Sequence, residues 1–247
     1  MKKSGLITRR EALITGITSL GGLMLIGCDQ PMPPTYGNIL RMGDALTYRV
    51  QRALLPGQSL VKEYLLSDIS SFPATGTINP ADTSKSYYSD IYDQLQRNTF
   101  SDWQLTIEGS VARPGKYSVN QLKSFPSKTQ ITRHTCEEGW TAIAEWTGVP
   151  LGNLLEYVGI HPSARFVNFY SYDGWVDSID MLDAFHPQTI LAYGMNGKNL
   201  SIPHGAPLRL RLEKQIGYKS MKYLEKIVVS DKYVDNGDSG WAWYVGI

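Results

Sequence analysis

The chain has 247 residues, with 24 lysines and arginines against 23 aspartates and glutamates, so its formal net charge is +1. A protein whose main partner is nucleic acid needs a strongly basic surface, and this balance excludes that class. Two cysteines cannot form the disulfide framework of a small secreted domain. The length instead suits one domain that is stabilised by a sizeable buried core.

The N-terminus predicts export and a lipid anchor. Arg9-Arg10 precedes an apolar run over residues 12–26, which ends in Leu25-Ile26-Gly27-Cys28. A positive start, a short apolar run and a small residue before the cut are typical of a signal peptide. The run is too short and glycine-rich to be a confident transmembrane span. An ordinary N-terminal anchor helix with an incidental arginine pair is the alternative.

The arginine pair resembles a twin-arginine (Tat) signal, and the last four residues of the run resemble a bacterial lipobox. We therefore expect residues 1–27 to be a signal peptide and Cys28 to carry the lipid, at the periplasmic face of the cytoplasmic membrane. Cleavage removes four basic residues and one acidic residue, which leaves 20 basic and 22 acidic residues in the mature chain. The mature protein is thus slightly acidic, and nucleic acid is not an expected partner.

The mature chain is predicted to consist of a tether over residues 28–37 and one domain over residues 38–247. The tether has three prolines and a glycine, a composition that favours an extended spacer. Residues 38–66 are expected to form a helix and a short strand. Residues 67–90 are rich in Ser, Thr, Pro, Asp and Gly, which predicts irregular structure.

Regular secondary structure is predicted from Trp103 onward. Alternating apolar and polar residues indicate strands, and helical runs next to a capping residue or a glycine indicate helices. The expected strands are 103–109, 130–135, 166–170, 208–212 and 226–229, and the expected helices are 118–122, 151–158 and 179–185. Because strands and short helices interleave without a regular βαβ period, we predict an α+β fold with mixed sheets and long irregular connections.

Cys136 is the most informative residue, since it is the only cysteine left once Cys28 is assigned to the predicted lipid anchor. It lies in the segment Arg133–Trp140, beside a histidine and two carboxylates. Such a thiol is a candidate metal ligand or nucleophile. A buried structural cysteine is an equally good interpretation of the local sequence. His134 shares a strand face with Cys136, which makes it either a neighbour of the site or a core histidine.

Four motifs in order resemble the sulfite oxidase superfamily of molybdopterin enzymes. They are Cys136-x-Glu138-x-Trp140 with residues 146–151, residues 191–197, His204-Gly205-x-Pro207-x-Arg209, and residues 217–222. The resemblance extends over about residues 72–229, and more loosely to 241–244, and it is nearest to exported bacterial members. It implies the molybdopterin-binding fold of that superfamily, with one molybdenum and one molybdopterin per chain, and oxygen-atom transfer as the reaction.

The resemblance also implies roles for particular residues. Cys136 would be the protein's thiolate ligand to molybdenum, a soft ligand for a soft metal centre. Glu138 would be a buried proton donor near the metal, and Trp175 would line the substrate pocket where many relatives carry tyrosine. The residues implied to contact the pterin or its phosphate are Gly76, Thr77, His134, Asp173, His204, Arg209, Lys219, Ser220, Met221 and Lys222.

Each of these residues has a plainer interpretation when it is taken alone. His204 could cap a turn, Arg209 and Arg211 could be exposed on one strand, and lysines 219 and 222 could be solvated. Zinc could use His134 and Cys136 with His161 or His204, although no zinc-ligand spacing is present. A cysteine nucleophile with His134 as base, or a non-catalytic lipoprotein, are the remaining alternatives. Only the joint pattern assigns these residues to a site.

The direction of the reaction is the least determined feature. Reduction of a sulfoxide or similar oxo substrate is favoured, and a sulfite-type oxidase is the alternative. Sulfite needs converging cations, whereas Arg133 and His134 have three glutamates near them in sequence, at positions 137, 138 and 145. No haem-binding histidine pair is evident in the N-terminal region. We therefore expect a small-molecule substrate and a separate electron-transfer partner, such as a membrane haem or quinone protein.

Overall fold

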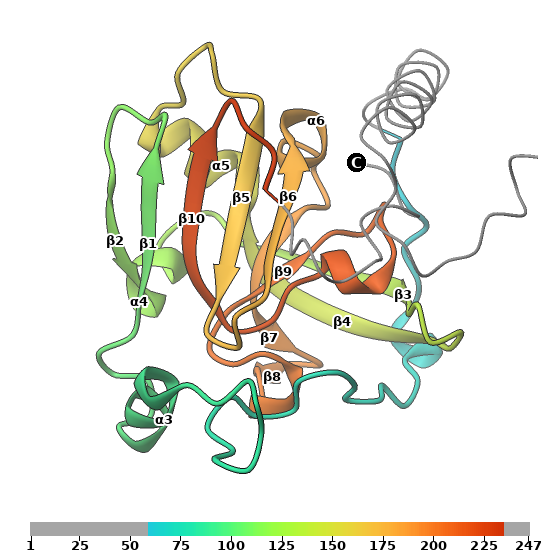
Figure 1. The fold of residues 1–247 in the computed structure, drawn as a ribbon. Helices are drawn as coiled ribbons and strands as arrows, with labels where there is room; N and C mark the ends of the chain where they lie inside the picture. The colour runs from blue at the N-terminus through green and yellow to red at the C-terminus, as the bar shows by residue number, and fades with distance from the viewer. Residues whose placement is uncertain (1–58, 235–247) are drawn as a thin grey trace, which may run out of the picture. The chain divides into compact units, whose positions relative to one another are not determined.

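Two β-sheets form the frame of the computed structural model, which describes residues 59–234 (Figure 1). The predicted signal peptide, the tether, Cys28, and residues 241–244 lie outside the described residues, as does most of the helix and strand expected over 38–66. Within the described part, Glu63 makes a single bridge to Thr132, and a short 3-10 turn, η2, spans Leu66–Asp68. No helix in residues 59–234 is long and apolar enough to cross a membrane.

The first sheet has the strand order β2-β1-β10-β5-β6. Its strands β1 and β10 run parallel, and its other pairs are antiparallel. The bounds are β1 (Gln104–Gly109), β2 (Gly115–Ser118), β5 (Phe166–Ser171), β6 (Val176–Asp180) and β10 (Leu224–Ser230).

The second sheet has the order β3-β4-β7-β8, with β9 also paired to β7, and all of its pairs are antiparallel. The bounds are β3 (Lys128–Thr135), β4 (Thr141–Pro150), β7 (Ile190–Met195), β8 (Lys198–Asn199) and β9 (Arg209–Arg211).

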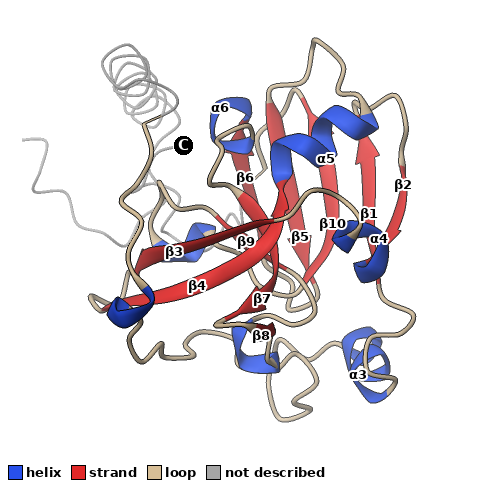
Figure 2. Cartoon of the chain, turned by 180° about the vertical axis from the view of Figure 1, so that it is seen from behind, coloured by secondary structure: helices blue, strands red, loops and turns tan. Residues whose placement is uncertain are grey.

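Short helices connect and cover the two sheets. They are α3 (Asp90–Arg97), α4 (Val119–Lys123), α5 (Leu151–Val158), α6 (Met181–Ala184) and the 3-10 turns η3 (Ile202–His204) and η4 (Gly217–Lys219). Figure 2 shows α5 lying over one face of the first sheet, where its buried leucines join the main core. That core also takes apolar residues from β1, β5, β10, β7 and β9, so the two sheets share one interior. The α+β fold with mixed sheets is confirmed.

Local sequence explains where α4 and α5 begin and end. The Ser118 hydroxyl accepts a hydrogen bond from the Gln121 backbone N–H, and the Gln121 side chain accepts one from the Ser118 backbone N–H, which makes a capping box. Gly159 ends α5 with a φ of 70°, a conformation that glycine adopts at little cost. Both helices match the predicted ranges within one residue.

Two predicted elements differ from the structure. The helix expected over 179–185 begins only at Met181, because Ile179 and Asp180 end strand β6 and the Asp180 carboxylate caps α6. The strand expected over 208–212 is present as β9, yet its residues do not alternate between core and solvent. Arg209, Leu210 and Arg211 are all buried, because both arginines lie in the interior of the molecule.

Candidate functional site

A cavity of about 380 Å³ is lined by Tyr87 and by five segments that are far apart in the sequence. The segments are residues 72–77, the turn after β3, the β5–β6 turn, the stretch from η3 to Arg209, and the stretch from η4 to Lys222. Among the described residues, all of the predicted site residues line this cavity except Glu138 and Lys219. The fold therefore brings together most of the predicted site residues, whereas motif residues 146–151 and 191–197 do not line the cavity.

Cys136 lies at the first position of the turn that joins β3 to β4. Its backbone N–H donates to the Trp140 carbonyl at 2.9 Å, and its carbonyl accepts from Gly139, whose φ is 91°. The side chain is 5% exposed and faces the cavity. Burial is the main cause that raises the pKa of the Cys136 thiol, and the neighbouring Glu137 adds to it. Among residues 59–234 no group of three or more His, Cys, Asp or Glu is placed to hold a metal ion. A metal at Cys136 would therefore need ligands from a cofactor.

Glu138 does not have the buried position that was predicted for it. Its side chain is exposed and accepts a hydrogen bond from Trp140 Nε1 at 2.9 Å. The reason is local, since Glu138 is in the middle of the turn between the two strands and points away from the cavity lining. The carboxylate that does line the cavity from this turn belongs to Glu137.

Lys219 is also placed differently from the prediction. It is 3% exposed, and its ammonium lies 2.6 Å from the Asp177 carboxylate and 3.1 Å from the Ser178 carbonyl. It is not part of the cavity lining. The ion pair instead fastens η4 to β6, which holds the next residues, Ser220 to Lys222, against the cavity.

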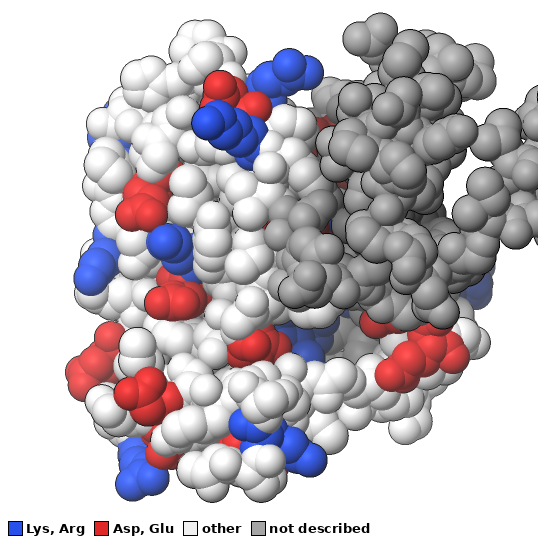
Figure 3. Space-filling view, in the orientation of Figure 1, with Lys and Arg blue, Asp and Glu red and all other residues white. Residues whose placement is uncertain are grey.

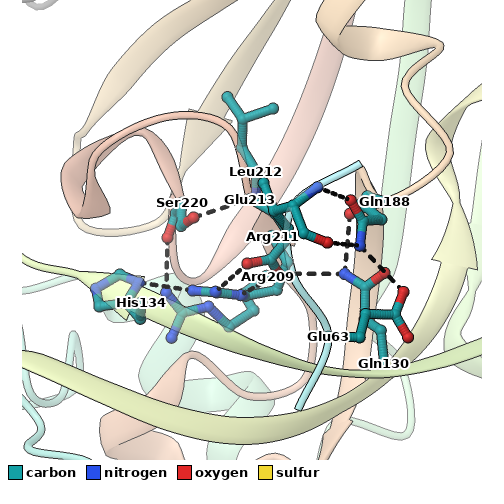
Figure 4. Close-up of polar contacts among 10 residues, drawn as sticks. Glu63, Gln130, His134, Gln188, Arg209, Arg211, Leu212, Glu213 and Ser220 are labelled. Carbon is teal, nitrogen blue, oxygen red and sulfur yellow. Dashed lines mark hydrogen bonds and ion pairs between the residues drawn. The ribbon is translucent and has the colours of Figure 1, made fainter. Parts of the chain in front are cut away.

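His134 is oriented by the buried ion pair between Arg211 and Glu213 (Figure 4). Arg211 donates to His134 Nδ1 at 2.8 Å, and its guanidinium makes two further contacts with the Glu213 carboxylate, at 2.8 and 3.2 Å. Because arginine can only donate, His134 Nδ1 must accept, which leaves the proton on Nε2. Burial, and then Arg211, lowers the pKa of His134 to about 2, so the ring is neutral.

The ring of His134 also needs a glycine opposite it. A Cβ on Gly217 would lie 2.6 Å from His134 Nε2, so no side chain could stand there without a shift. Phe72 packs against the same imidazole at 5.1 Å between ring centroids, and against Trp140, Trp146 and His204. Neither Phe72 nor the Arg211–Glu213 pair has a role that the sequence motifs predict, although Arg211 stands two residues after a motif arginine.

Arg209 and Ser220 form a second cluster at the cavity. Arg209 donates to the carbonyls of His204 and Ser220, at 3.1 and 2.7 Å, and its guanidinium lies over the Trp146 ring. Burial, and then the neighbouring Arg211, lowers the pKa of Arg209 to about 9. A guanidinium in that environment is stabilised by an anion in the cavity.

Lys222 ties residues 75–77 to the rest of the site. Its ammonium donates to the carbonyls of Thr75 and Pro203, at 2.9 and 3.1 Å, and also to the Thr77 carbonyl. All three N–H bonds of the ammonium are thus engaged. Lys222 therefore contributes positive charge to the cavity but has no N–H left to donate to a ligand. Burial, and then Arg209, lowers the pKa of Lys222 to about 7, while Asp173 opposes the shift.

The remaining predicted residues complete this end of the cavity. Asp173 is near Thr77 and Trp175, and burial raises the pKa of its carboxyl against their hydrogen bonds. Gly76 has a φ of 65° and open space where a Cβ would be, and Met221 is buried beside Ser220. His204, whose pKa is lowered by burial and then by Arg209, closes the lining next to Pro203.

The donors of this cavity fit a large anionic cofactor that binds through one thiolate. Three buried donor atoms on the lining have no hydrogen-bond partner: Arg209 Nε, Trp175 Nε1 and Tyr218 Oη. Two cations, Arg209 and Lys222, face the cavity, and native structures rarely leave such groups without a counterpart. A volume in this range is typical of a small-molecule or cofactor site.

Comparison with known proteins identifies the class to which this fold and site belong. The family of the oxidoreductase molybdopterin-binding domain matches residues 93–237. The chain belongs to this family, within the sulfite oxidase superfamily that the motifs resemble, and it is an oxidoreductase. The family implies a molybdenum–molybdopterin cofactor, in agreement with the thiol, the two cations and the unpartnered Arg209 Nε of the cavity.

Two relatives and one solved structure show which members of this class the chain is similar to. The chain is 32% identical to a provisionally named protein-methionine-sulfoxide reductase subunit, YedZ1, of Azospira oryzae, over 96% of this chain and 87% of that protein. It is 34% identical to the protein-methionine-sulfoxide reductase catalytic subunit MsrP of Xanthomonas axonopodis pv. citri, over 53% of this chain and 46% of MsrP. The sulfane dehydrogenase SoxCD of Paracoccus pantotrophus has a TM-score of 0.51 and 25% identity, over 54% of this chain and 39% of that one. The chain thus spans less than half the length of the latter two proteins.

Proposed function

We propose that this chain is an exported oxidoreductase that reduces a sulfoxide or a related oxo substrate at a molybdenum–molybdopterin cofactor. The observation that carries the proposal is the cavity in which the Cys136 thiol, two buried cations and three unpartnered donors meet. The names of the relatives MsrP and YedZ1 support a sulfoxide as the substrate class.

We assign three roles in cofactor binding to the residues of the cavity. Cys136 would bind the metal as a thiolate, losing the proton that burial now holds on it. Arg209 and Lys222 would balance the negative charge of the pterin's phosphate, with Ser220 and its neighbours as hydrogen-bond donors. His134, oriented by Arg211, would donate from Nε2. When bound, the molybdenum supplies a two-electron centre for oxygen-atom transfer.

Reduction of a sulfoxide breaks one S–O bond, consumes two electrons and two protons, and yields a sulfide and water. The electrons would come from a separate donor protein, for which a membrane haem or quinone protein is our proposal. Glu137 lines the cavity beside Cys136, and a carboxylate at that point disfavours a dianion such as sulfite and tolerates a neutral oxo compound.

A sulfite-type oxidase is the second candidate. It is favoured by Arg209 and Lys222, which could attract an anionic substrate if the cofactor left one of them free. The structural similarity to a sulfane dehydrogenase also supports an oxidative reaction. In that case electrons would leave the cofactor for a separate acceptor.

Metal analysis and two assays on one sample test the proposal. The protein is purified from a host that makes molybdopterin, and its molybdenum and zinc contents are measured. One assay follows oxidation of a reduced viologen dye by methionine sulfoxide, and the other follows reduction of ferricyanide by sulfite. We expect one molybdenum per chain and oxide reduction. Zinc in place of molybdenum contradicts the cofactor, sulfite turnover alone favours the oxidase, and a loaded protein with neither activity favours a non-catalytic binding role.

A further inference from the structure

Two of the unpartnered donors are on neighbouring aromatic rings that line the cavity. The Tyr218 hydroxyl and the Trp175 indole N–H are both buried atoms without a hydrogen-bond partner, on side chains that line the cavity. Their rings are in edge contact, with centroids 6.5 Å apart and planes at 68°. They come from different elements, η4 and the β5–β6 turn, so the fold is what brings them together.

Tyr218 and, through its ring contact, Trp175 lie in the part of the cavity that is near the Cys136 turn. Tyr218 follows Gly217, which packs directly against the imidazole of His134, two residues before Cys136. The Glu137 carboxylate is near enough to contribute to the raised pKa of Tyr218. The third unpartnered donor, Arg209 Nε, differs in this respect, because the rest of its guanidinium is held by His204 and Ser220. Arg209 therefore suits the cofactor, whereas the aromatic pair remains available to another ligand.

The chemistry of the pair specifies that ligand. A buried hydroxyl and a buried indole N–H both require acceptors, and an indole can only donate. Burial, and then the Asp177 charge, raises the pKa of Tyr218 well above its usual range, so its hydroxyl stays protonated and available as a donor. One oxygen atom with two lone pairs can accept from both groups at once.

We propose, on the basis of the function proposed above, that Tyr218 and Trp175 together bind the oxygen atom of the oxo substrate. Tyr218 is the new assignment, as a residue that contacts substrate and selects compounds with a strongly accepting oxygen, such as sulfoxides and N-oxides. Both donors become more effective as negative charge develops on that oxygen while its bond breaks. The buried Lys219–Asp177 ion pair holds η4 in place, and with it the tyrosine.

The test compares Tyr218→Phe with wild type and with Tyr157→Phe. Tyr218→Phe removes the hydroxyl and keeps the ring, while Tyr157 is 52% exposed and lies outside the cavity lining, so Tyr157→Phe is a matched control. Molybdenum and pterin contents are measured first and should be equal in all three proteins. With methionine sulfoxide and a reduced viologen dye, kcat/KM of Tyr218→Phe should fall about 10- to 100-fold, and that of the control should not change.

A binding measurement separates substrate recognition from turnover. Calorimetric titration of the oxidised holoenzyme with methionine sulfoxide, without reductant, should give a Kd that rises in Tyr218→Phe and in Trp175→Phe but not in Tyr157→Phe. Unchanged kinetics and unchanged Kd in Tyr218→Phe overturn the proposal. Loss of pterin from Tyr218→Phe also overturns it, because the hydroxyl then serves the cofactor. If wild type holds molybdenum but reduces no sulfoxide, the proposed function fails, and the titration still decides whether Tyr218 binds an oxygen ligand.

Discussion

Cys136 is the residue that we propose as the protein's ligand to the metal. Replacing it with alanine removes the only thiol that faces the cavity among the described residues. We expect Cys136→Ala to lose activity and molybdenum while keeping its fold, because a side chain this small contributes only about 1 kcal/mol of packing. Metal analysis and thermal unfolding of variant and wild type measure the two effects. Full retention of molybdenum in the variant would contradict the assignment.

Lys222 gives the cofactor-free protein a specific pH dependence. Its pKa falls from 10.5 to about 7 on folding, so between these values the unfolded chain binds more protons than the folded one. Stability from this residue therefore rises as pH increases from about 7 toward 10, and it is flat below 7, where both states are protonated. A cofactor phosphate would raise the folded pKa and remove the slope.

Urea unfolding of cofactor-free wild type and Lys222→Met, at several pH values from 6 to 10, checks this expectation. The difference between the two proteins should shift in favour of wild type as the pH rises, because methionine has no proton to lose. A constant difference would mean that the carbonyls of Thr75, Thr77 and Pro203 keep the ammonium charged throughout.

Single residues were predictable to different degrees. Cys136, His204 and Arg209 were identified because their order and spacing form motifs, and each lines the cavity. Glu138 was identified from the same motif, but its predicted burial was wrong, since a position two residues after the cysteine does not reveal which side of a tight turn a side chain takes. Tyr218 stood within a recognised motif, but only the fold shows that its hydroxyl lacks a partner.

At the level of elements, capping and periodicity correctly predicted α4, α5, β1 and β10. They did not predict strand β4, where residues typical of strands and residues typical of turns occur together. Strand β4 contains Gly148 and Pro150, which look like breakers in the sequence. In the structure the register with β7 shifts next to Gly148, where a Cβ would lie 2.3 Å from the Leu191 carbonyl. The glycine is required by close approach of two strands in a bulge, a long-range cause that one segment of sequence cannot reveal.

The β3–β9 contact holds the most consequential buried ion pair. The Arg211 and Glu213 side chains are 1% and 0% exposed, and Gln130 on β3 adds a hydrogen bond to Glu213. Removing one partner leaves a buried charge, so Arg211→Met should cost about 3–5 kcal/mol in the free energy of unfolding. The double variant Arg211→Met with Glu213→Met should recover part of this loss.

Urea unfolding of the two single variants and the double variant measures the coupling. The matched control is the pair Asp93–Arg97 on α3, where the arginine is 76% exposed and Arg97→Ala should cost far less than Arg211→Met, because water screens the pair. Equal losses at the two pairs would contradict the view that burial makes the Arg211–Glu213 pair sensitive. In addition, ¹⁵N spectra of the imidazole groups should show the His134 tautomer altered in Arg211→Met.

At the scale of the whole molecule, the site exists because two sheets bring distant segments to one cavity. From composition, residues 72–77 were expected as irregular structure, and only the family resemblance implied that Gly76 and Thr77 contact the pterin. In the structure, Thr77 is held by contacts to Lys222 and Tyr223, which are about 145 positions later. Periodicity cannot predict such contacts. The family resemblance supplied them indirectly, through motifs whose common cavity no single segment contains.

The surface agrees with the charge balance of the sequence. On the face shown in Figure 3, acidic and basic side chains are interspersed, without a continuous patch of one sign. A binding site for nucleic acid would show a basic stripe or patch. The two cations of the cavity, Arg209 and Lys222, line its interior and do not add to a basic surface.

The predicted export would determine where the loaded protein works, and this prediction rests on the sequence of the first 28 residues. A cofactor that is inserted in the cytoplasm requires a route for folded proteins, so Arg9-Arg10→Lys-Lys should leave the loaded enzyme in the cytoplasm. Cell fractionation with molybdenum analysis of each fraction measures this, and periplasmic protein in the double-lysine variant would contradict the twin-arginine route.

The lipid on Cys28 is tested separately. Cys28→Ser should either release the protein from the membrane or leave it uncleaved, whereas wild type should incorporate radiolabelled lipid. One acyl chain gives only weak, reversible attachment, so stable anchoring requires more than one chain on this residue. Such an anchor would keep the enzyme beside a membrane electron donor and raise its local concentration there. Wild type that takes up no labelled lipid would remove the anchor, while the cofactor site, which lies within residues 72–222, would be unaffected.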